Sequence, residues 1–198
     1  MKLNTEKYLS ALSVWPPNGK HVLAQYDNEG IWVYQAYRPE IANHAVQHQR
    51  LDTCSLFSCT RMSWIKTNFL WMQYRSGWST KENQERCLAI KLERSFFDWL
   101  LANAVESNEK IREKIEQSDI RLQWDPDHDP IGRKCERRAI QLGVRKDALM
   151  KIATGEKVLE ILDVTDFVES QRSAALNEAL WKDLIVPIER VYEPITRL

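Results

Sequence analysis

The chain has 198 residues, of which 43% are apolar, with 28 Lys and Arg against 28 Asp and Glu. A chain of this size and composition buries enough surface to fold as one compact domain, which excludes a mainly disordered or collagen-like protein. A formal charge of zero removes the basic excess that is typical of nucleic-acid-binding proteins, so any such binding must come from a local patch.

The first residues carry no recognisable targeting signal. Residues 1–20 contain charged side chains and a Pro-Pro-Asn-Gly break at 16–19, in place of the apolar run of a signal peptide. No stretch approaches the roughly 18 apolar residues that a membrane span needs. We therefore expect a cytoplasmic protein with no membrane association, whose four cysteines stay reduced. Residues 1–19 are expected to form an N-terminal arm with a short helix.

Hydrophobic patterns and turn signals predict strands and helices along most of the chain. Runs rich in β-branched and aromatic residues predict strands, and amphipathic runs predict helices. The expected strands are 31–37, 61–66, 85–93, 120–124 and 138–143. The expected helices are 39–48, 68–74, 95–105, 147–153, 156–169 and 173–184, with a charged stretch at 106–117 and a turn-rich loop at 125–131.

This order mixes strands and helices without strict alternation. The sequence therefore predicts an α+β fold, a single domain with a central mixed or antiparallel sheet of about five strands and flanking helices. Residues 169–198 are expected to be an acidic helical tail packed on the domain. Two basic blocks, 61–86 and 121–146, offset the acidic end of the chain.

Cations and aromatic residues are interleaved between positions 61 and 78. The cations are Arg61, Lys66 and Arg75, and the rings among them are Trp64, Trp71, Tyr74 and Trp78. Guanidinium groups bind phosphate bidentately and indole rings stack on bases, so this pattern is typical of a nucleotide pocket. The alternative is that the rings are core and the cations cover them with their aliphatic stems. Next to Arg75, Ser76 precedes a glycine that would let the backbone approach a ligand.

Other candidate residues lie on the predicted strands. Gln35 and Tyr37 share one face, which either lines a cleft or is half exposed. Arg138 and Gln141 lie on opposite faces of a late strand, so only one of them can reach a given pocket. Glu85 is a candidate general base or ribose-hydroxyl acceptor, unless it is a surface carboxylate paired with a neighbouring cation.

No metal is expected. Asp125, Asp127 and Asp129 have the spacing of a calcium loop, but Pro130 stands where that loop needs glycine. The cysteines lack the two pairs of a zinc site. The sequence also has no P-loop, no Gly-rich dinucleotide fingerprint and no nucleophile elbow.

Several unusual aromatic-polar strings follow one another along the chain. They are YQAY at 34–37, RMSWIK at 61–66, FLWMQYRSGW at 69–78, QWDP at 123–126, RAIQLG at 138–143 and DVT at 163–165. In this order they closely resemble domain-of-unknown-function family 4291. The resemblance covers residues 20–168 and implies no reaction.

The element order is also similar, more distantly, to small ADP-ribosyltransferase folds, whose strands surround a cleft for NAD. That resemblance implies an ADP-ribosyltransferase-like fold with NAD as cofactor. Those enzymes usually carry a glutamate on a late strand, where this chain has Arg138 and Gln141. Glu85 or Glu136 would then have to supply the carboxylate.

Together these observations favour a nucleotide-handling transferase that moves ADP-ribose from NAD to nucleic acid or protein. The expected catalytic residues are Glu85, Gln141 and Tyr37. The expected nucleotide-binding residues are Gln35, Arg61, Trp64, Lys66, Trp71, Tyr74, Arg75, Ser76 and Arg138. One alternative is a non-catalytic module that binds single-stranded nucleic acid, and another is a protein whose acidic tail docks a partner or a second copy.

Overall fold

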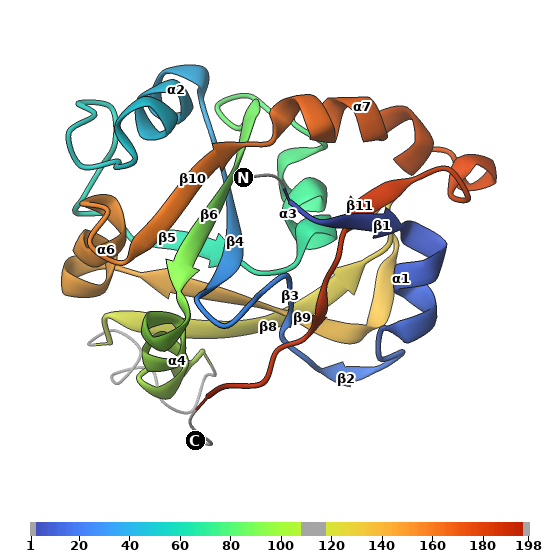
Figure 1. The fold of residues 1–198 in the computed structure, drawn as a ribbon, viewed down its shortest axis with the longest axis horizontal. Helices are drawn as coiled ribbons and strands as arrows, with labels where there is room; N and C mark the ends of the chain where they lie inside the picture. Colours follow the sequence, from blue (N-terminus) through green and yellow to red (C-terminus); the bar gives the residue numbers. More distant parts are fainter. Residues whose placement is uncertain (1–2, 108–117, 196–198) are drawn as a thin grey trace.

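The computed structural model describes residues 3–107 and 118–195 (Figure 1). The expected charged stretch 106–117 therefore lies almost wholly outside the described residues. The helices are α1 (Tyr8–Val14), α2 (Pro39–His48), α3 (Phe69–Ser76), α4 (Arg94–Ala102), α6 (Lys146–Ala153) and α7 (Thr165–Ala175). The strands are β1 (Thr5–Lys7), β2 (Gly19–Lys20), β3 (Leu23–Ala24), β4 (Gly30–Tyr37), β5 (Ser63–Lys66), β6 (Arg86–Glu93), β7 (Val105–Glu106), β8 (Ile120–His128), β9 (Lys134–Val144), β10 (Val158–Asp163), β11 (Ile185–Pro187) and β12 (Arg190–Val191).

An eight-stranded mixed sheet forms the frame of the molecule. Its order is β10-β6-β4-β5-β9-β8-β7, with β2 beside β9. The pairs are antiparallel except β7–β8 and β2–β9. The predicted α+β class and the mixed sheet are confirmed, whereas the expected number of about five strands is too low. The additional strands are the two-residue segments β2 and β7, and β10, which was expected to be helical.

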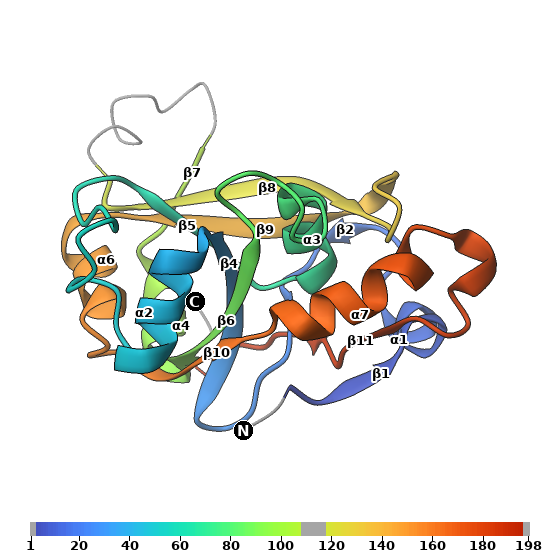
Figure 2. The same cartoon turned by 90° about the horizontal axis from the view of Figure 1, so that it is seen from above.

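The sheet bends sharply between β4 and β5. In Figure 1, β10, β6 and β4 run steeply across the view, while β5, β9 and β8 run nearly horizontally, and Figure 2 shows β8 and β9 together along one side. Strand β4 pairs with β6 along its whole length but with β5 only at Tyr34↔Lys66. Beyond that pair the Gln35 side chain replaces the backbone hydrogen bonds. Its Nε2 donates to Ser63 Oγ at 2.6 Å and to the Trp64 carbonyl at 3.2 Å. Side chains rather than a backbone ladder therefore line the space where the two halves separate.

Helices cover both faces of the steep half of the sheet. On β4, Ile31 and Val33 pack with α2, α4 and α6 in one core cluster, and Trp32 and Tyr34 pack with α1, α3 and α7 in the other. This alternation follows from the two-residue period of a strand. Because both faces are buried, β4 reads as a continuous apolar run.

Three local predictions are wrong. Residues 158–163, expected to be helical, form the edge strand β10, because their backbone pairs with β6. The expected helix 173–184 is replaced by the end of α7 at Ala175 and a short 3₁₀ turn capped by Asn177. The expected loop at 125–131 is mostly strand, since the β8–β9 ladder continues through Pro126. In each case long-range pairing or a local cap overrides the hydrophobic period.

The C-terminal segment is extended rather than helical after α7. Strand β11 pairs with β1, and β12 pairs with β3, so the C-terminal segment packs along strands from the N-terminal part of the chain. Between them Glu189, which is 1% exposed, accepts hydrogen bonds from Asn68 Nδ2 and from the Phe69 amide at 2.7 Å. This carboxyl satisfies orphan donors at the N-terminus of α3 and so helps to position that helix.

Among the described residues, none of the helices has the length and apolar character to cross a membrane. All four cysteines are free thiols.

Candidate polar binding site

A polar cavity of about 510 Å³ opens where β4 and β5 separate. Its walls come from the ends of these strands, from α3, from the turn before β6 and from β9. The lining residues are Gln35, Ala36, Tyr37, Arg61, Met62, Ser63, Trp64, Lys66, Met72, Arg75, Asn83, Gln84 and Gln141. Among these described lining residues there are three cations and four amides but no carboxylate. The cavity therefore has the chemistry of an anion site.

Lys66 is the most unusual of these residues. Only 6% of its surface is exposed, and its ammonium forms no hydrogen bond or ion pair with any residue that the structure describes. Lys91 on β6 offers a direct comparison, because it is 3% exposed and its Nζ lies 2.6 Å from Asp27 Oδ2. Buried charges are normally paired. Lys66 therefore differs from Lys91 in having no ion-pair partner among the described residues.

The surroundings of Lys66 make its charge costly in the free protein. The pKa of Lys66 is lowered from its usual 10.5 to about 8, mainly by burial and also by the Arg75 guanidinium, while the Asp125 carboxylate acts in the opposite direction. An anion beside the ammonium would reverse both unfavourable effects. The described residues therefore leave the charge of Lys66 only partly compensated.

Two arginines stand at the edge of the cavity. Arg61 and Arg75 are both exposed, and neither forms an ion pair with a residue in the described ranges. The Arg75 guanidinium lies 6.0 Å from the centre of the Trp71 ring, which limits where it points. Together with Lys66 these groups place three positive charges around one hollow.

Fixed amide and hydroxyl groups complete the polar walls. Gln141 lies opposite Lys66 in the β5–β9 ladder and donates to Asp125 Oδ2 at 2.7 Å. Tyr37 donates to Gln35 Oε1 at 2.9 Å. Burial raises the pKa of Tyr37 to about 12, so its phenol stays neutral at physiological pH. These hydrogen bonds hold the side chains in place before any ligand enters.

Gly143 makes room for the indole ring in the cavity wall. It pairs with Trp64 across the β5–β9 ladder, and a Cβ at this position would lie 3.0 Å from Trp64 Cη2 and 2.7 Å from Met62 Sδ. Any larger residue would displace both side chains. Packing against Trp64 and Met62 therefore explains why the RAIQLG string ends in glycine.

The turn before β6 has an unusual backbone. Trp78, Ser79 and Asn83 have φ values of 56°, 62° and 61°, a region that bulky residues rarely adopt. Glu85 supports this turn, because its Oε1 accepts from the Asn83 amide at 2.8 Å. Glu85 thus lies behind the wall that its neighbours form.

The structure brings seven of the predicted site residues to this cavity. They are Gln35, Tyr37, Arg61, Trp64, Lys66, Arg75 and Gln141. Five others do not line it, namely Glu85, Trp71, Tyr74, Ser76 and Arg138. As the strand period predicts, Gln141 reaches the cavity and Arg138 does not.

Two of the aromatic rings expected at the site, Trp71 and Tyr74, pack against the protein, whereas Tyr37 and Trp64 line the cavity. Tyr74 and Trp71 are nearly parallel to the His128 imidazole, with centres 3.7 Å and 5.1 Å from it. Ser76 is buried and its Oγ donates to the Gln73 carbonyl. These residues support the wall of the site from behind.

Sequence reasoning missed several lining residues. Asn83 and Gln84 contribute amides, and Met62, Ser63 and Met72 fill the space between the cations. Gln84 is an exception, because the sequence offers it together with Glu85 as the pair that could accept a ribose hydroxyl. The others carry no signal in the sequence that separates them from ordinary turn or core residues.

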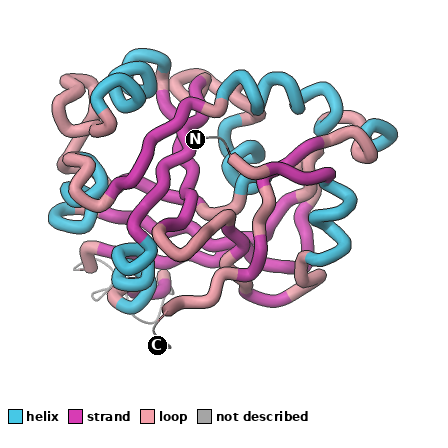
Figure 3. Tube along the Cα trace, viewed as in Figure 1, coloured by secondary structure: helices cyan, strands magenta, loops and turns pink. Residues whose placement is uncertain are grey.

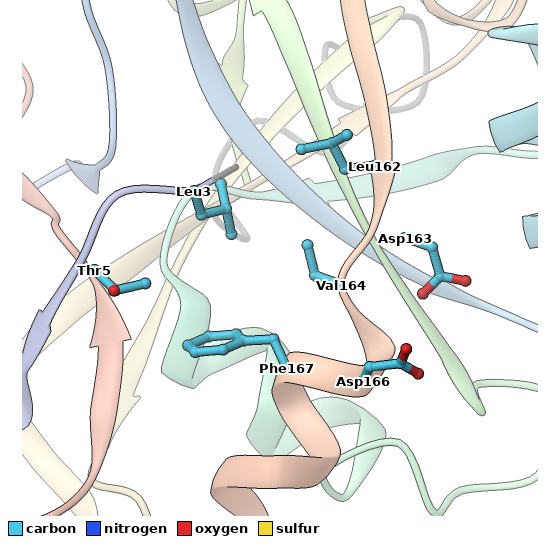
Figure 4. A pocket seen from close by; sticks show the side chains of 7 residues that line it. All are labelled: Leu3, Thr5, Leu162, Asp163, Val164, Asp166 and Phe167. Atoms are coloured by element: carbon cyan, nitrogen blue, oxygen red, sulfur yellow. The ribbon is translucent and has the colours of Figure 1, made fainter. Parts of the chain in front are cut away.

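A second hollow of about 520 Å³ lies between the N-terminal segment and the start of α7 (Figure 4). It is lined by Leu3, Thr5, Leu162, Asp163, Val164, Asp166 and Phe167, none of which is a predicted site residue. Figure 4 shows both carboxylates pointing away from Leu3 and Thr5, and Asp163 is held by Arg86. This hollow lacks the converging polar groups of the cavity at β5.

Residues 21–192 match the family model described as Domain of unknown function (DUF4291). The chain belongs to this family. The match confirms the resemblance of the aromatic-polar strings and extends it from residue 168 to residue 192. The DUF4291 domain therefore includes β11, β12 and the Glu189 contact to α3. A comparison with curated proteins finds no match for the chain.

Proposed function

We propose that this DUF4291 domain is a nucleotide-handling transferase that binds nucleotide phosphates in the polar cavity and uses NAD as a donor of ADP-ribose. The observation that supports this most strongly is the buried, unpaired ammonium of Lys66 between Arg61 and Arg75. Hydrogen bonds from such groups to phosphate are charge-assisted and roughly twice as strong as neutral ones. The diphosphate of NAD carries two negative charges and several oxygen atoms that can accept hydrogen bonds from these three cations.

The remaining walls suit a ribose. Transfer of ADP-ribose breaks the bond between ribose C1′ and nicotinamide, which leaves with the bonding electrons, while an acceptor atom bonds to C1′ and loses its proton. Gln84 and Gln141 are placed to hold ribose hydroxyls, and Gln141 is kept in position by Asp125. Glu85, next to Gln84, lies behind this wall, so we assign it to holding the Asn83 turn rather than to contact with the reacting atoms.

The ADP-ribosyltransferase-like fold is part of this proposal. A cavity at the bend between two halves of a sheet fits the cleft between strands that the resemblance implies. The chain departs from the ADP-ribosyltransferase pattern on β9, which supplies Gln141 in place of a glutamate. We therefore assign Gln141 to binding the ribose rather than to proton transfer.

The test is incubation with NAD labelled in its adenylate part, together with RNA, DNA or protein. The proposal predicts transfer of the label, release of nicotinamide, and thermal stabilisation of the protein by NAD. Lys66→Met should abolish all three. If NAD neither stabilises the protein nor transfers its label, the proposal is overturned.

A comparison of two arginines, one from each basic block, gives a sharper binding test. Arg75→Ala should weaken NAD binding by about tenfold or more, because it removes a charge-assisted hydrogen bond. Arg138→Ala is the matched control, since Arg138 is an exposed arginine that does not line the cavity. Calorimetric titration of both variants measures the difference. Equal losses of NAD affinity in the two variants would show that the phosphates do not bind in the cavity.

NAD affinity should also depend on pH. Anion binding requires protonated Lys66, whose pKa in the free protein is about 8, with Arg75 from α3 and Asp125 from β8 facing it. The affinity should therefore be full below about pH 8 and decline as the pH rises through that value. The phosphates of NAD do not titrate between pH 6 and 10. In Lys66→Arg the decline should disappear, because arginine keeps its proton; a profile unchanged by this substitution would contradict the role of Lys66.

Non-catalytic binding of single-stranded nucleic acid is the alternative that the same experiments exclude or support. It needs successive exposed rings for base stacking. Trp71 and Trp78 are 5% and 4% exposed, which leaves few rings for such a track. Tight oligonucleotide binding that falls steeply with salt, without any NAD binding, would favour this alternative.

A further inference from the structure

A smaller hollow of about 220 Å³ adjoins the polar cavity. Four residues, Tyr37, Arg61, Met62 and Ser63, line both spaces. The smaller hollow adds Ile41 from α2 and Leu56, Phe57 and Ser58 from the connection between α2 and β5, which Figure 3 shows as one continuous loop. The two hollows therefore adjoin each other along these four residues.

The two parts differ in chemistry. Cations and amides dominate the cavity beside Lys66, whereas aliphatic and aromatic side chains dominate the extension. Its walls include the rings of Phe57 and Tyr37, which lie edge to face with centres 6.0 Å apart. Leu56 is 51% exposed at this wall. An apolar wall beside an anion site suits a ligand with a charged end and a planar, weakly polar end.

The loop that carries Leu56 and Phe57 is held in place. Its start is anchored where the Leu51 amide donates to the Ala153 carbonyl at 2.7 Å, and the Phe57 amide donates to the Cys54 carbonyl at 3.0 Å. Leu51 and Cys54 are 1% and 8% exposed and belong to the core. The apolar wall is therefore formed before a ligand arrives, which lowers the entropy lost on binding.

Arg61 stands at the junction of the two parts. It lines both hollows and forms no ion pair with any residue in the described part of the chain. A guanidinium group binds phosphate through its edge and packs against a ring through its face. This position matches the link between the phosphates and the base of a nucleotide.

We propose that the extension is the base subsite of the site and that the ligand is a nucleoside diphosphate, with its diphosphate beside Lys66 and its planar base against Phe57 and Leu56. This inference rests on the proposed function, because it requires phosphates in the polar cavity. It adds the ligand class and the direction in which the ligand lies.

The experiment compares ADP with inorganic pyrophosphate by calorimetric titration, using the full chain without divalent cations. The wild-type protein should bind ADP about tenfold or more tightly than pyrophosphate. Leu56→Ser and Phe57→Ala should remove most of this preference and leave pyrophosphate binding unchanged. Leu56→Ser alters an exposed side chain, so it tests the inference even if Phe57→Ala does not fold.

Two controls separate the inference from the function on which it rests. Leu176→Ser changes an equally exposed leucine, 56% accessible, that lines neither hollow, and it should leave both affinities unchanged. Lys66→Met should weaken both ligands. Pyrophosphate binding that depends on Lys66, with no preference for ADP or no effect of Leu56→Ser, would overturn the base subsite and leave the phosphate site intact. Failure of both ligands to bind would overturn the phosphate site, and the subsite with it.

Discussion

A Lys66→Met variant is expected to unfold at a higher temperature than the wild-type protein and to lose its affinity for nucleotide phosphates. Burial lowers the pKa of Lys66 from 10.5 to about 8, and each pH unit of such a change corresponds to about 1.4 kcal/mol. Removing the unpaired charge should therefore raise the free energy of unfolding at pH 7 by at most about 3 kcal/mol. Thermal unfolding and calorimetric titration of the same preparation measure both effects.

The gain in stability has a defined pH window. The unfolded chain holds the Lys66 proton up to about pH 10.5, whereas the folded protein releases it near pH 8. The penalty in the wild type is complete below pH 8 and disappears as the pH approaches 10.5, so the two proteins should then be equally stable. Lys91→Met is the control, because Lys91 is equally buried but paired with Asp27, and its loss should not stabilise the protein. A Lys66→Met variant less stable than the wild type at pH 7 would show that Lys66 has a structural partner.

Arg137→Met should have the opposite effect and destabilise the protein by about 3–5 kcal/mol. Arg137 and Asp127 are 3% and 1% exposed and form an ion pair inside the molecule. Arg137 also donates to the Pro16 carbonyl at 3.2 Å and lies over the Trp15 ring. Removing it would leave the Asp127 carboxylate buried without its partner. Urea unfolding at pH 7 measures the loss.

Two variants check this interpretation of Arg137. Arg138→Met changes the adjacent, exposed arginine on the other face of β9 and should leave the free energy of unfolding nearly unchanged. Arg137→Met combined with Asp127→Asn should recover much of the lost stability, since no buried charge remains. If the double variant is as unstable as Arg137→Met alone, packing of the guanidinium rather than charge pairing explains the loss.

The sequence predicts those parts of the fold that depend on local pattern. The run from Ile31 to Tyr37 becomes β4 because β-branched and aromatic residues cluster behind a turn signal. Pro39 opens α2 because its fixed φ suits the first turn of a helix. Tertiary pairing decides the other parts. Residues 158–163 become a strand only because the edge of β6 is free to receive them.

The candidate site shows the same division between features that local pattern predicts and features that tertiary pairing decides. A cluster of cations and rings in one segment indicates an anion site, and the strand period separates Gln141 from Arg138. The convergence of Lys66 and Gln141 depends on the register of β5 against β9, which joins segments more than seventy residues apart. The Trp71 ring stacks on His128 instead of lining the cavity. This contact depends on β8, which carries His128 and which no local pattern near Trp71 reveals.

A crystal structure of the protein grown with ADP tests the central claim most directly. The account predicts the diphosphate in the polar cavity, with an oxygen within about 3.2 Å of Lys66 Nζ and others facing Arg61 and Arg75. An ordered ADP bound elsewhere on the molecule, or a cavity that stays empty at saturating ADP while Lys66 pairs with a carboxylate, would contradict it.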